Sequence, residues 1–158
     1  MVNDNGSEFI TSVTVRMGDA DSTSRAYPSR FFEWSHRAFE DLLMCAGDSL
    51  QAMFEEEDWG MPLVHAELHV VRGPSFDERL KIRLRLERLG SQSVTFQFQF
   101  SDARGQEVAN TRLVHAFTRL SDIARTIDVP DRLVGVFGRM GLLGSGKTSS
   151  IGELKDTM

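Results

Sequence analysis

The chain has 158 residues, a formal net charge of −5, and 41% hydrophobic and 26% charged residues. Its length suits a single domain that buries about two-thirds of the surface of the unfolded chain. The acidic balance argues against general nucleic-acid binding, because phosphate contacts require a basic face. The single cysteine, Cys45, excludes a disulfide framework and a cysteine zinc site.

The sequence also lacks the marks of a membrane or secreted protein. It contains no run of roughly 18 apolar residues, and its first residues, MVNDNGSEF, are polar and acidic, unlike a signal peptide. We therefore expect a cytoplasmic protein with no membrane segment.

The first half of the chain predicts a strand, a loop and a long helix. Apolar and polar residues alternate over residues 8–17, as in a half-buried strand, and small polar residues follow to Pro28. From Ser29 to Glu57 apolar residues recur at steps of three and four, which is typical of a helix with one broad buried face. Ser29 suits the N-cap. Gly47-Asp48 either kinks this helix or divides it, with Asp48 as a new N-cap.

The second half predicts an antiparallel sheet. Apolar and polar residues alternate over residues 64–70, 80–87, 94–101 and 107–120, and short connections join these segments. Each predicted strand has one apolar face, so the long helix has to cover the sheet. The sequence therefore predicts an α+β fold with one strand, a helix and then four strands. Residues 130–140 suggest a further short helix.

Two motifs are set aside because their context does not fit. Residues 141–148 match the phosphate-binding pattern G-x-x-x-x-G-K-T, but that loop must follow a strand of a parallel sheet and open a helix. His65 and His69 share a strand face at a separation of roughly 13 Å, which is too far for one metal ion. We expect no metal site.

A carboxylate just before the long helix is the strongest candidate for chemistry. Asp21 precedes the predicted helix start at Pro28 and Ser29. Backbone N–H groups at a helix N-terminus have no intrahelical partner, and together with a carboxylate they can act on a carbonyl placed between them. The alternative is that Asp21 caps a turn or faces water, as most loop carboxylates do.

The stretch GDADSTSRAYPSRFFEWSHRAFEDLL resembles the hot-dog-fold acyl-CoA thioesterases of the 4-hydroxybenzoyl-CoA thioesterase type. Those proteins carry a G-D-x-D-x-x-G-x-V-aromatic-aromatic loop followed by an aromatic-rich helix. The resemblance covers roughly residues 8–132 and continues through residues 61–67, 89–96 and 129–130. It implies a hot-dog fold, in which a long central helix is wrapped by a curved five-stranded antiparallel sheet.

The resemblance implies roles for particular residues. Asp21, not Asp19, is the carboxylate that attacks the thioester carbonyl or activates water against it, and helix-start N–H groups polarise the carbonyl oxygen. Arg25 meets an anionic acyl group or points to solvent. The residues expected to shape or line the carbonyl pocket are Tyr27, Pro28, Ser29, Phe31 and Phe32.

Two positions depart from the family pattern. Ser24 stands where the family loop has glycine, and an ungapped alignment places Pro28 at the second aromatic. Proline has no N–H, so either the carbonyl-polarising amide is lost or Ser29 supplies it. An alignment with gaps pairs Tyr27-Pro28 with an aromatic-proline pair that follows in some members.

We therefore expect an acyl-CoA thioesterase that hydrolyses an aryl-CoA resembling 4-hydroxybenzoyl-CoA, or a short acyl-CoA, to the free acid and CoA. Coenzyme A is part of the substrate, and no other cofactor is expected. The alternative is a hot-dog protein that binds an acyl thioester or aromatic ligand without turning it over. The resemblance implies a homodimer or homotetramer, with residues 63–72 as the strand that pairs across the two-fold axis. The predicted domain spans residues 1–132, with a partly helical and then flexible extension at 133–158.

Overall fold

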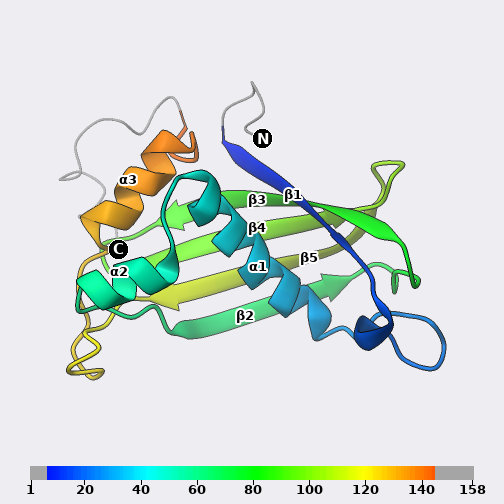
Figure 1. Ribbon diagram of the computed structural model, residues 1–158, viewed down its shortest axis with the longest axis horizontal. Coiled ribbons are helices and arrows are strands. Elements are labelled where there is room, and N and C mark those ends of the chain that lie inside the picture. The colour runs from blue at the N-terminus through cyan, green and yellow to red at the C-terminus, as the bar shows by residue number, and fades with distance from the viewer. Residues whose placement is uncertain (1–6, 145–158) are drawn as a thin grey trace.

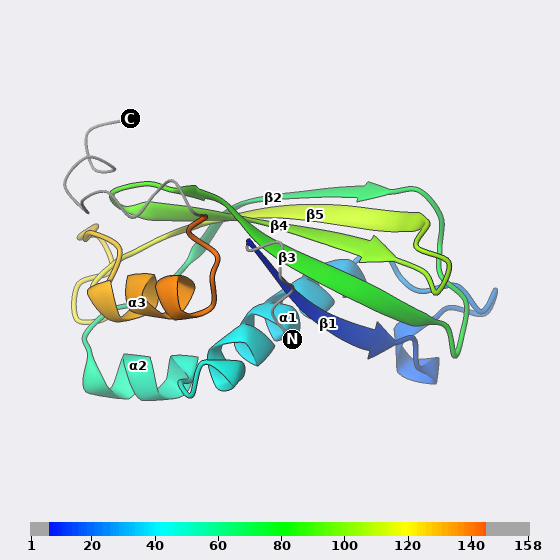
Figure 2. The same cartoon turned by 90° about the horizontal axis from the view of Figure 1, so that it is seen from above.

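The computed structural model describes residues 7–144, and within them a curved antiparallel sheet carries all helices on one face (Figures 1 and 2). The elements in chain order are β1 (Glu8–Thr14), a short 3-10 turn (Met17–Asp19), α1 (Arg30–Cys45), α2 (Leu50–Glu56), β2 (Leu63–Val70), β3 (Arg79–Leu89), β4 (Ser93–Ser101), β5 (Glu107–Ala116) and α3 (Asp131–Arg139). The sheet has five strands in the order β1-β3-β4-β5-β2. The predicted α+β hot-dog architecture is confirmed.

The alternating sequence pattern fixes which side chains face the helices. Leu84 of β3 pairs with Phe98 of β4, and both are almost fully buried. Their neighbours Arg83 and Gln99 also pair but face away from the helices. Because side chains alternate along a strand, each strand presents an apolar inner face and a polar outer face.

Helix α1 crosses the inner face of the sheet and supplies most of the covering layer. Phe31 and Phe39 lie on this helix, and each contacts a phenylalanine ring of β4, with ring centroids 5.0 Å and 4.8 Å apart respectively. Ser35 is the polar exception on the buried face. Its hydroxyl donates to the carbonyl of Phe31 and bonds to the Thr111 hydroxyl of β5, so neither buried oxygen lacks a partner.

Of the two outcomes predicted for Gly47-Asp48, a kink or a division, the structure shows the division: residues 29–57 form two helices, α1 and α2. Gly47 has a φ of 78°, in the left-handed region that favours glycine, and the chain turns there. Ser49 caps α2, because its hydroxyl accepts the Ala52 N–H at 3.1 Å. The prediction of Asp48 as the new N-cap is therefore wrong. The Asp48 carboxylate accepts the N–H of Ser49 and pairs with Arg132 instead.

Helix α3 completes the core at the end of the sheet that lies beside α2. Leu133, Val136 and Phe137 are fully buried, and the ring of Phe137 packs on that of Phe96 with centroids 5.7 Å apart. Arg132 binds Asp48 through two hydrogen bonds of 2.8 Å each. The core thus extends past residue 132, where the sequence placed the domain boundary. Residues 145–158, which contain the second half of the phosphate-loop match and the part of the extension expected to be flexible, lie outside the described residues.

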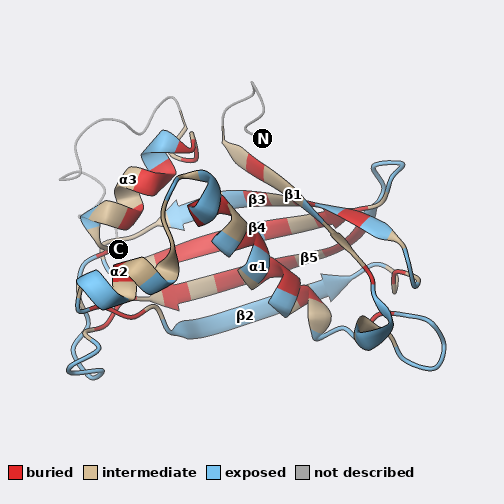
Figure 3. Cartoon of the chain, viewed as in Figure 1, coloured by how far each residue is buried: buried red, intermediate tan, exposed pale blue. Residues whose placement is uncertain are grey.

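Strand β2 differs from the other strands because the helical layer does not cover it (Figure 3). It forms one edge of the sheet and pairs only with β5. Val64 and Val70 lie on its apolar face, yet they are 59% and 37% exposed. An edge strand with an open apolar face is a surface that pairs readily with another chain.

Candidate active site

The site predicted from the sequence lies in the loop between the 3-10 turn and α1, at one end of the molecule (Figure 1). The loop folds back on itself, because Asp21 N–H donates to the Arg25 carbonyl and Ser24 N–H donates to the Asp21 carbonyl. Isolated bridges join Ala20 to Ala26 and Arg25 to Ser75. The loop is therefore held by its own backbone and by the β2–β3 connection.

Ser24 has the backbone geometry that glycine favours. Its φ is 61°, in the left-handed region, where an L-residue is strained by about 1–2 kcal/mol. The family pattern places glycine at this position. The loop therefore keeps a conformation suited to glycine, although the residue is serine.

The Asp21 carboxylate is held by one oxygen. Its Oδ1 atom accepts hydrogen bonds from the Thr23 N–H at 2.8 Å and the Thr23 hydroxyl at 2.5 Å, and from the Arg25 N–H at 3.5 Å. The Oδ2 atom has no protein partner among residues 7–144. The Thr23 hydroxyl, followed by the Thr23 N–H, holds the pKa of Asp21 below its ordinary value. Asp21 is thus an ionised, oriented and exposed carboxylate.

Asp19, the other carboxylate of the GDAD sequence, has a structural role. Its Oδ2 atom accepts the Arg16 N–H at 2.9 Å, and its Oδ1 atom lies 3.6 Å from the Arg30 guanidinium. Its backbone carbonyl accepts the Tyr27 N–H at 2.8 Å. These contacts tie the 3-10 turn to the start of α1, so the carboxylate left free for chemistry is Asp21.

The start of α1 offers one open backbone donor. The N–H groups of Arg30, Phe31 and Phe32 donate to the carbonyls three residues earlier, and Pro28 has no N–H. The Ser29 N–H has no acceptor among the described residues. The Ser29 hydroxyl makes no capping bond, and its backbone is already helical at φ −59° and ψ −24°. An unpaired N–H at the positive end of a helix is suited to bind an oxyanion.

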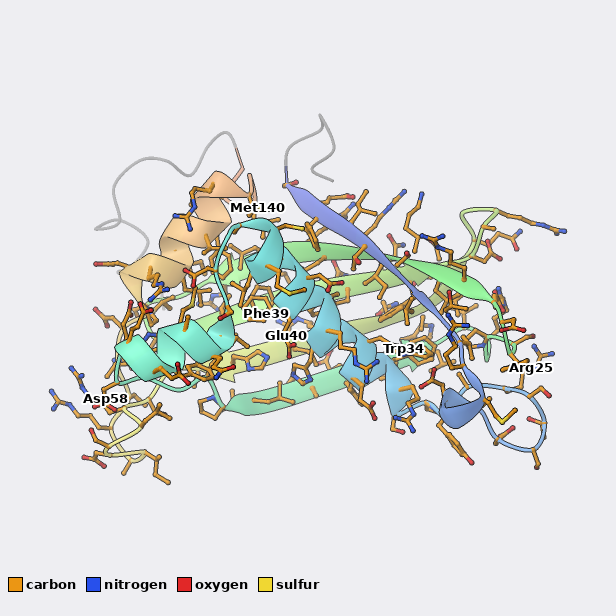
Figure 4. All side chains as sticks on the ribbon, viewed as in Figure 1. Arg25, Trp34, Phe39, Glu40, Asp58 and Met140 are labelled. Atoms are coloured by element: carbon orange, nitrogen blue, oxygen red, sulfur yellow. The ribbon has the colours of Figure 1, made fainter. Side chains whose placement is uncertain are left out.

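The other predicted binding residues divide between surface and core. Tyr27 is 47% exposed, and Pro28 and Ser29 are exposed. The Arg25 guanidinium donates to the Ser75 hydroxyl and to the Gly73 carbonyl, so it lies against the β2–β3 connection at the edge of the molecule (Figure 4). Gly73 permits this approach, because an added Cβ there would lie 3.3 Å from the Arg25 Cβ.

Phe31 and Phe32 occupy different environments. Phe31 is fully buried and packs edge-on against Trp34 and Phe100, so the structure gives it a core position within this chain. Phe32 is partly buried at the margin of the core. Of the two, only Phe32 is accessible to a ligand in the chain as described.

The sequence reasoning missed Thr23, which holds and orients Asp21. The signal was present in the sequence. An aspartate side chain commonly accepts a hydrogen bond from the backbone N–H two residues later, and a threonine at that position can also donate its hydroxyl. Ser75 and Gly73 were also missed. Nothing in the sequence indicated that the β2–β3 connection would contact the loop some fifty residues earlier.

Metal binding and membrane crossing find no support in the described part of the chain. No three His, Cys, Asp or Glu side chains gather there as metal ligands would. His65 instead contacts the Glu67 carboxylate at 2.7 Å. None of the helices in residues 7–144 has the length and apolar character needed to cross a bilayer.

A sequence model of the thioesterase-like superfamily matches residues 15–137, so the chain belongs to this superfamily. Several relatives are named 1,4-dihydroxy-2-naphthoyl-CoA hydrolase. The one from Acaryochloris marina is 29% identical over 89 residues, 56% of this chain and 64% of the relative. The one from Synechococcus elongatus is 27% identical over 120 residues, 75% of this chain and 87% of the relative. The relatives are thus named as thioester hydrolases.

Solved structures agree on the fold. The 1,4-dihydroxy-2-naphthoyl-CoA thioesterase of Synechocystis superposes with a TM-score of 0.77 at 22% identity, covering 83% of this chain and 96% of that one. A Staphylococcus aureus protein solved in complex with CoA has a TM-score of 0.76 at 9% identity, covering 97% of this chain and 89% of that one. The hot-dog thioesterase class is confirmed, while the 4-hydroxybenzoyl-CoA type stays a prediction.

Proposed function

We propose that the protein is an acyl-CoA thioesterase acting on aromatic acyl-CoA thioesters, with 1,4-dihydroxy-2-naphthoyl-CoA as the first substrate to test. Superfamily membership and the names of the relatives support the reaction class. The observation that carries the proposal is Asp21, an ionised carboxylate with one oxygen held and the other open. 4-Hydroxybenzoyl-CoA is the second substrate to test.

In the proposed mechanism, Asp21 and Ser29 act on opposite sides of the thioester carbonyl. The free Oδ2 atom of Asp21 either attacks the carbonyl carbon or removes a proton from the water that attacks it. The Ser29 N–H donates to the oxygen as it gains negative charge. Collapse of the tetrahedral intermediate breaks the carbon–sulfur bond, and the departing thiolate takes up the proton that water gives up. When water attacks, this collapse yields the free acid directly. When Asp21 attacks, it leaves an acyl-aspartyl anhydride, which water then hydrolyses to the free acid and the regenerated carboxylate.

We also propose that the working unit is a homodimer or homotetramer. Tyr27, Pro28 and Ser29 are exposed in the single chain, whereas a site for an aromatic acyl group has to exclude water. Strand β2 has a free edge and an open apolar face. Pairing of β2 with its two-fold mate would close this free edge, so light scattering of the purified protein should give at least twice the mass of the chain.

The test is thiol release from a panel of aromatic and short acyl-CoA substrates by wild-type protein and two matched variants. Asp21→Asn should lower kcat/KM at least ~10²-fold without changing the unfolding temperature, because the amide can neither attack nor accept a proton. Asp19→Asn should lower the unfolding temperature and retain most of the activity. Normal turnover by Asp21→Asn together with an inactive Asp19→Asn would show that Asp19, not Asp21, is the catalytic carboxylate.

The alternative function, ligand binding without turnover, is favoured by the missing N–H at Pro28. It predicts that no acyl-CoA is hydrolysed by the wild-type protein, while calorimetry still detects binding of an aromatic acyl-CoA. That pair of results would replace the enzyme proposal.

A further inference from the structure

The loop that carries Asp21 pairs with the connection between β2 and β3. Residues 24–26 of the loop run antiparallel to residues 74–76 of the connection, and two backbone hydrogen bonds of 3.0 Å each join the two segments. Arg25 and Ser75 form the bridge between them. We refer to this pairing as the loop contact. Two strands that pair over so few residues are marginally stable on their own, so side chains have to hold them together.

The Arg25 side chain lies across the loop contact, at the end of the molecule shown in Figure 4. Its guanidinium donates to the Ser75 hydroxyl and, at 3.4 Å, to the Gly73 carbonyl. Its aliphatic part lies against Gly73, where an added Cβ would be 3.3 Å to 3.7 Å from three carbons of the arginine side chain. Arg25 therefore binds two residues of the connection, although its own backbone belongs to the loop.

The backbone of Arg25 holds Asp21 directly. The Arg25 carbonyl accepts the Asp21 N–H at 2.9 Å, and the Arg25 N–H donates to the Asp21 Oδ1 atom at 3.5 Å. Both the main chain and the carboxylate of Asp21 are thus bonded to the residue whose side chain is fixed on the connection. A displacement of Arg25 would therefore displace Asp21.

The connection is a firm support, because an ion pair closes it. Arg72 at its start binds the two oxygens of Glu78 at its end, at 3.0 Å and 2.5 Å, and also binds Asp102 at 3.1 Å. Glu78 accepts the Ser75 N–H at 2.9 Å as well. The hydrogen bond from Arg72 holds the pKa of Glu78 below its ordinary value, so this carboxylate is ionised at neutral pH.

Backbone strain lies on both sides of the loop contact. Within residues 7–144, the non-glycine residues with a positive φ are Ser24 at 61° and Asp77 at 62°. The Ser24 carbonyl accepts the N–H of Phe76, the residue before Asp77. A residue with a Cβ keeps the left-handed conformation only where the surrounding contacts impose it, and such strain gathers at functional sites.

We propose that Arg25 is a positioning residue, which fixes the Asp21 loop on the β2–β3 connection and so sets the direction of the free Asp21 oxygen. The inference rests on the proposed thioesterase reaction. Arg25 then acts through Asp21, in place of the predicted contact with an anionic acyl group. Because a displacement of about 1 Å at a reacting group can cost much of its rate, loosening the loop contact should lower kcat rather than raise KM.

The kinetic test changes the loop contact from both sides. Arg25→Gln should lower kcat for the best aromatic acyl-CoA about tenfold with KM unchanged, and Ser75→Ala should lower it in the same way but less. The double variant should be no slower than Arg25→Gln, and Arg25→Lys should recover part of the rate. Arg79→Gln is the matched control and should change neither constant. Arg79 also binds a serine hydroxyl, that of Ser12 at 2.9 Å and 3.2 Å, but on the strands β3 and β1.

Two kinetic results would overturn the inference. A higher KM confined to acyl-CoA substrates with an acidic acyl group, at normal kcat, would show that Arg25 binds the substrate instead. The second result comes from Arg25→Gln in the Asp21→Asn background, where it should cost no further activity because the group it positions is already absent. A further tenfold loss there would show that Arg25 acts independently of Asp21.

Hydrogen exchange tests the loop contact without turnover. The backbone N–H groups of Ala26 and Phe76 donate across it, to Pro74 and Ser24, so they should exchange faster in Arg25→Gln and at the wild-type rate in Arg79→Gln. Unchanged exchange in Arg25→Gln overturns the inference, whatever the protein hydrolyses, and so does faster exchange with a normal kcat. Faster exchange in a protein that hydrolyses no thioester supports the loop contact and overturns the proposed function. Unchanged unfolding temperatures establish that the variants are folded.

Discussion

The two ends of helix α1 are built differently. At its N-terminus the chain is exposed, Tyr27 is half open, and the Ser29 N–H has no acceptor in the described chain. At its C-terminus Leu42 and Leu43 are fully buried, and the Ala46 N–H closes the last turn. Arg132 and Asp48 join that end to α3.

The difference separates the source of stability from the source of chemistry. The C-terminal end buries large apolar side chains, which is the main favourable term in folding. The loop before α1, residues 20–29, is instead shaped by hydrogen bonds among mostly exposed groups, which contribute much less to stability than the burial of Phe31 and Trp34 in the first turns of the helix. An accessible carboxylate and an unpaired N–H are possible at one end because the other end holds the fold.

Removal of the Phe137 ring should give the largest loss of stability. Phe137→Ala deletes a fully buried ring that packs on Phe96, and large-to-small changes of this kind cost about 3–5 kcal/mol. Chemical unfolding measures the change. Phe76→Ala, at the exposed end of the molecule, is the control and should cost far less, since Phe76 is 44% exposed. Equal losses for both variants would contradict the comparison.

Acidification should weaken the core through two histidines. His36 of α1 and His115 of β5 are in edge-on contact, with ring centroids 5.6 Å apart. Burial lowers the pKa of both, and His36 lowers that of His115 further. The unfolded chain then binds more protons below its histidine pKa of about 6.5, so the free energy of unfolding should fall as the pH drops through this value.

A pH series of unfolding midpoints between about 7.5 and 5 tests this expectation. The aspartates and glutamates with resolved shifts have pKa values below 3.8 and 4.5, so they do not titrate in this window. His36→Gln should flatten the dependence, because it removes one of the two histidines whose pKa is lowered by burial. A wild-type midpoint that rises on acidification would show that the pair favours its protonated form.

One substitution in the loop before α1 should increase the stability of the protein. Ser24→Gly should raise the free energy of unfolding by up to about 1 kcal/mol, because glycine adopts the left-handed backbone at residue 24 without strain. Activity should be unchanged, since the loop conformation is the same. Gly105→Ala is the reciprocal control and should be destabilising, as Gly105 has a φ of 80° in an otherwise open turn. A loss of stability in Ser24→Gly would mean that the serine side chain supports the loop.

The smallest effect is expected at Pro28. Pro28→Tyr restores both an N–H and the aromatic ring of the family pattern, and Pro28→Ala restores the N–H alone. If the Ser29 N–H already serves as the donor, neither variant should gain activity. Loss of an oxyanion donor typically costs ~10²–10³-fold in rate, so a gain of that size in both variants would show that the wild type lacks one.

The strand pattern could be predicted from the sequence because side-chain alternation and burial coincide in β3, β4 and β5. The division of the long helix at Gly47-Asp48 was one of two predicted outcomes, but the identity of the cap was less accessible. Asp48 and Ser49 are both suitable N-caps by residue type. In the structure Asp48 pairs with Arg132, 84 residues later in the chain, and Ser49 caps α2. The predicted strand over 107–120 ends at Ala116, because Thr118 pairs with Gly60 and Thr126 instead.

The site was predicted unevenly for a similar reason. Asp21 and the helix start follow from local sequence, since the loop directly precedes an amphipathic helix. Local sequence does not predict which of Phe31 and Phe32 lies in the core, because the two residues are adjacent and equally apolar. Only the rotation of α1 on the sheet places Phe31 against Phe100 and leaves Phe32 at the margin.

Strand β2 has a consequence for the chain before it meets a partner. Within residues 7–144 the outer backbone edge of β2, from the exposed Leu63 to the exposed Val70, pairs with no other strand, and such edges nucleate amyloid-like stacking of identical chains. The outward-facing His65, Glu67 and His69 break the apolar run at every second position, as gatekeeper residues do. At high protein concentration these polar side chains should favour pairing of two β2 strands in the proposed dimer over fibre formation. Replacing all three by apolar residues should favour fibres.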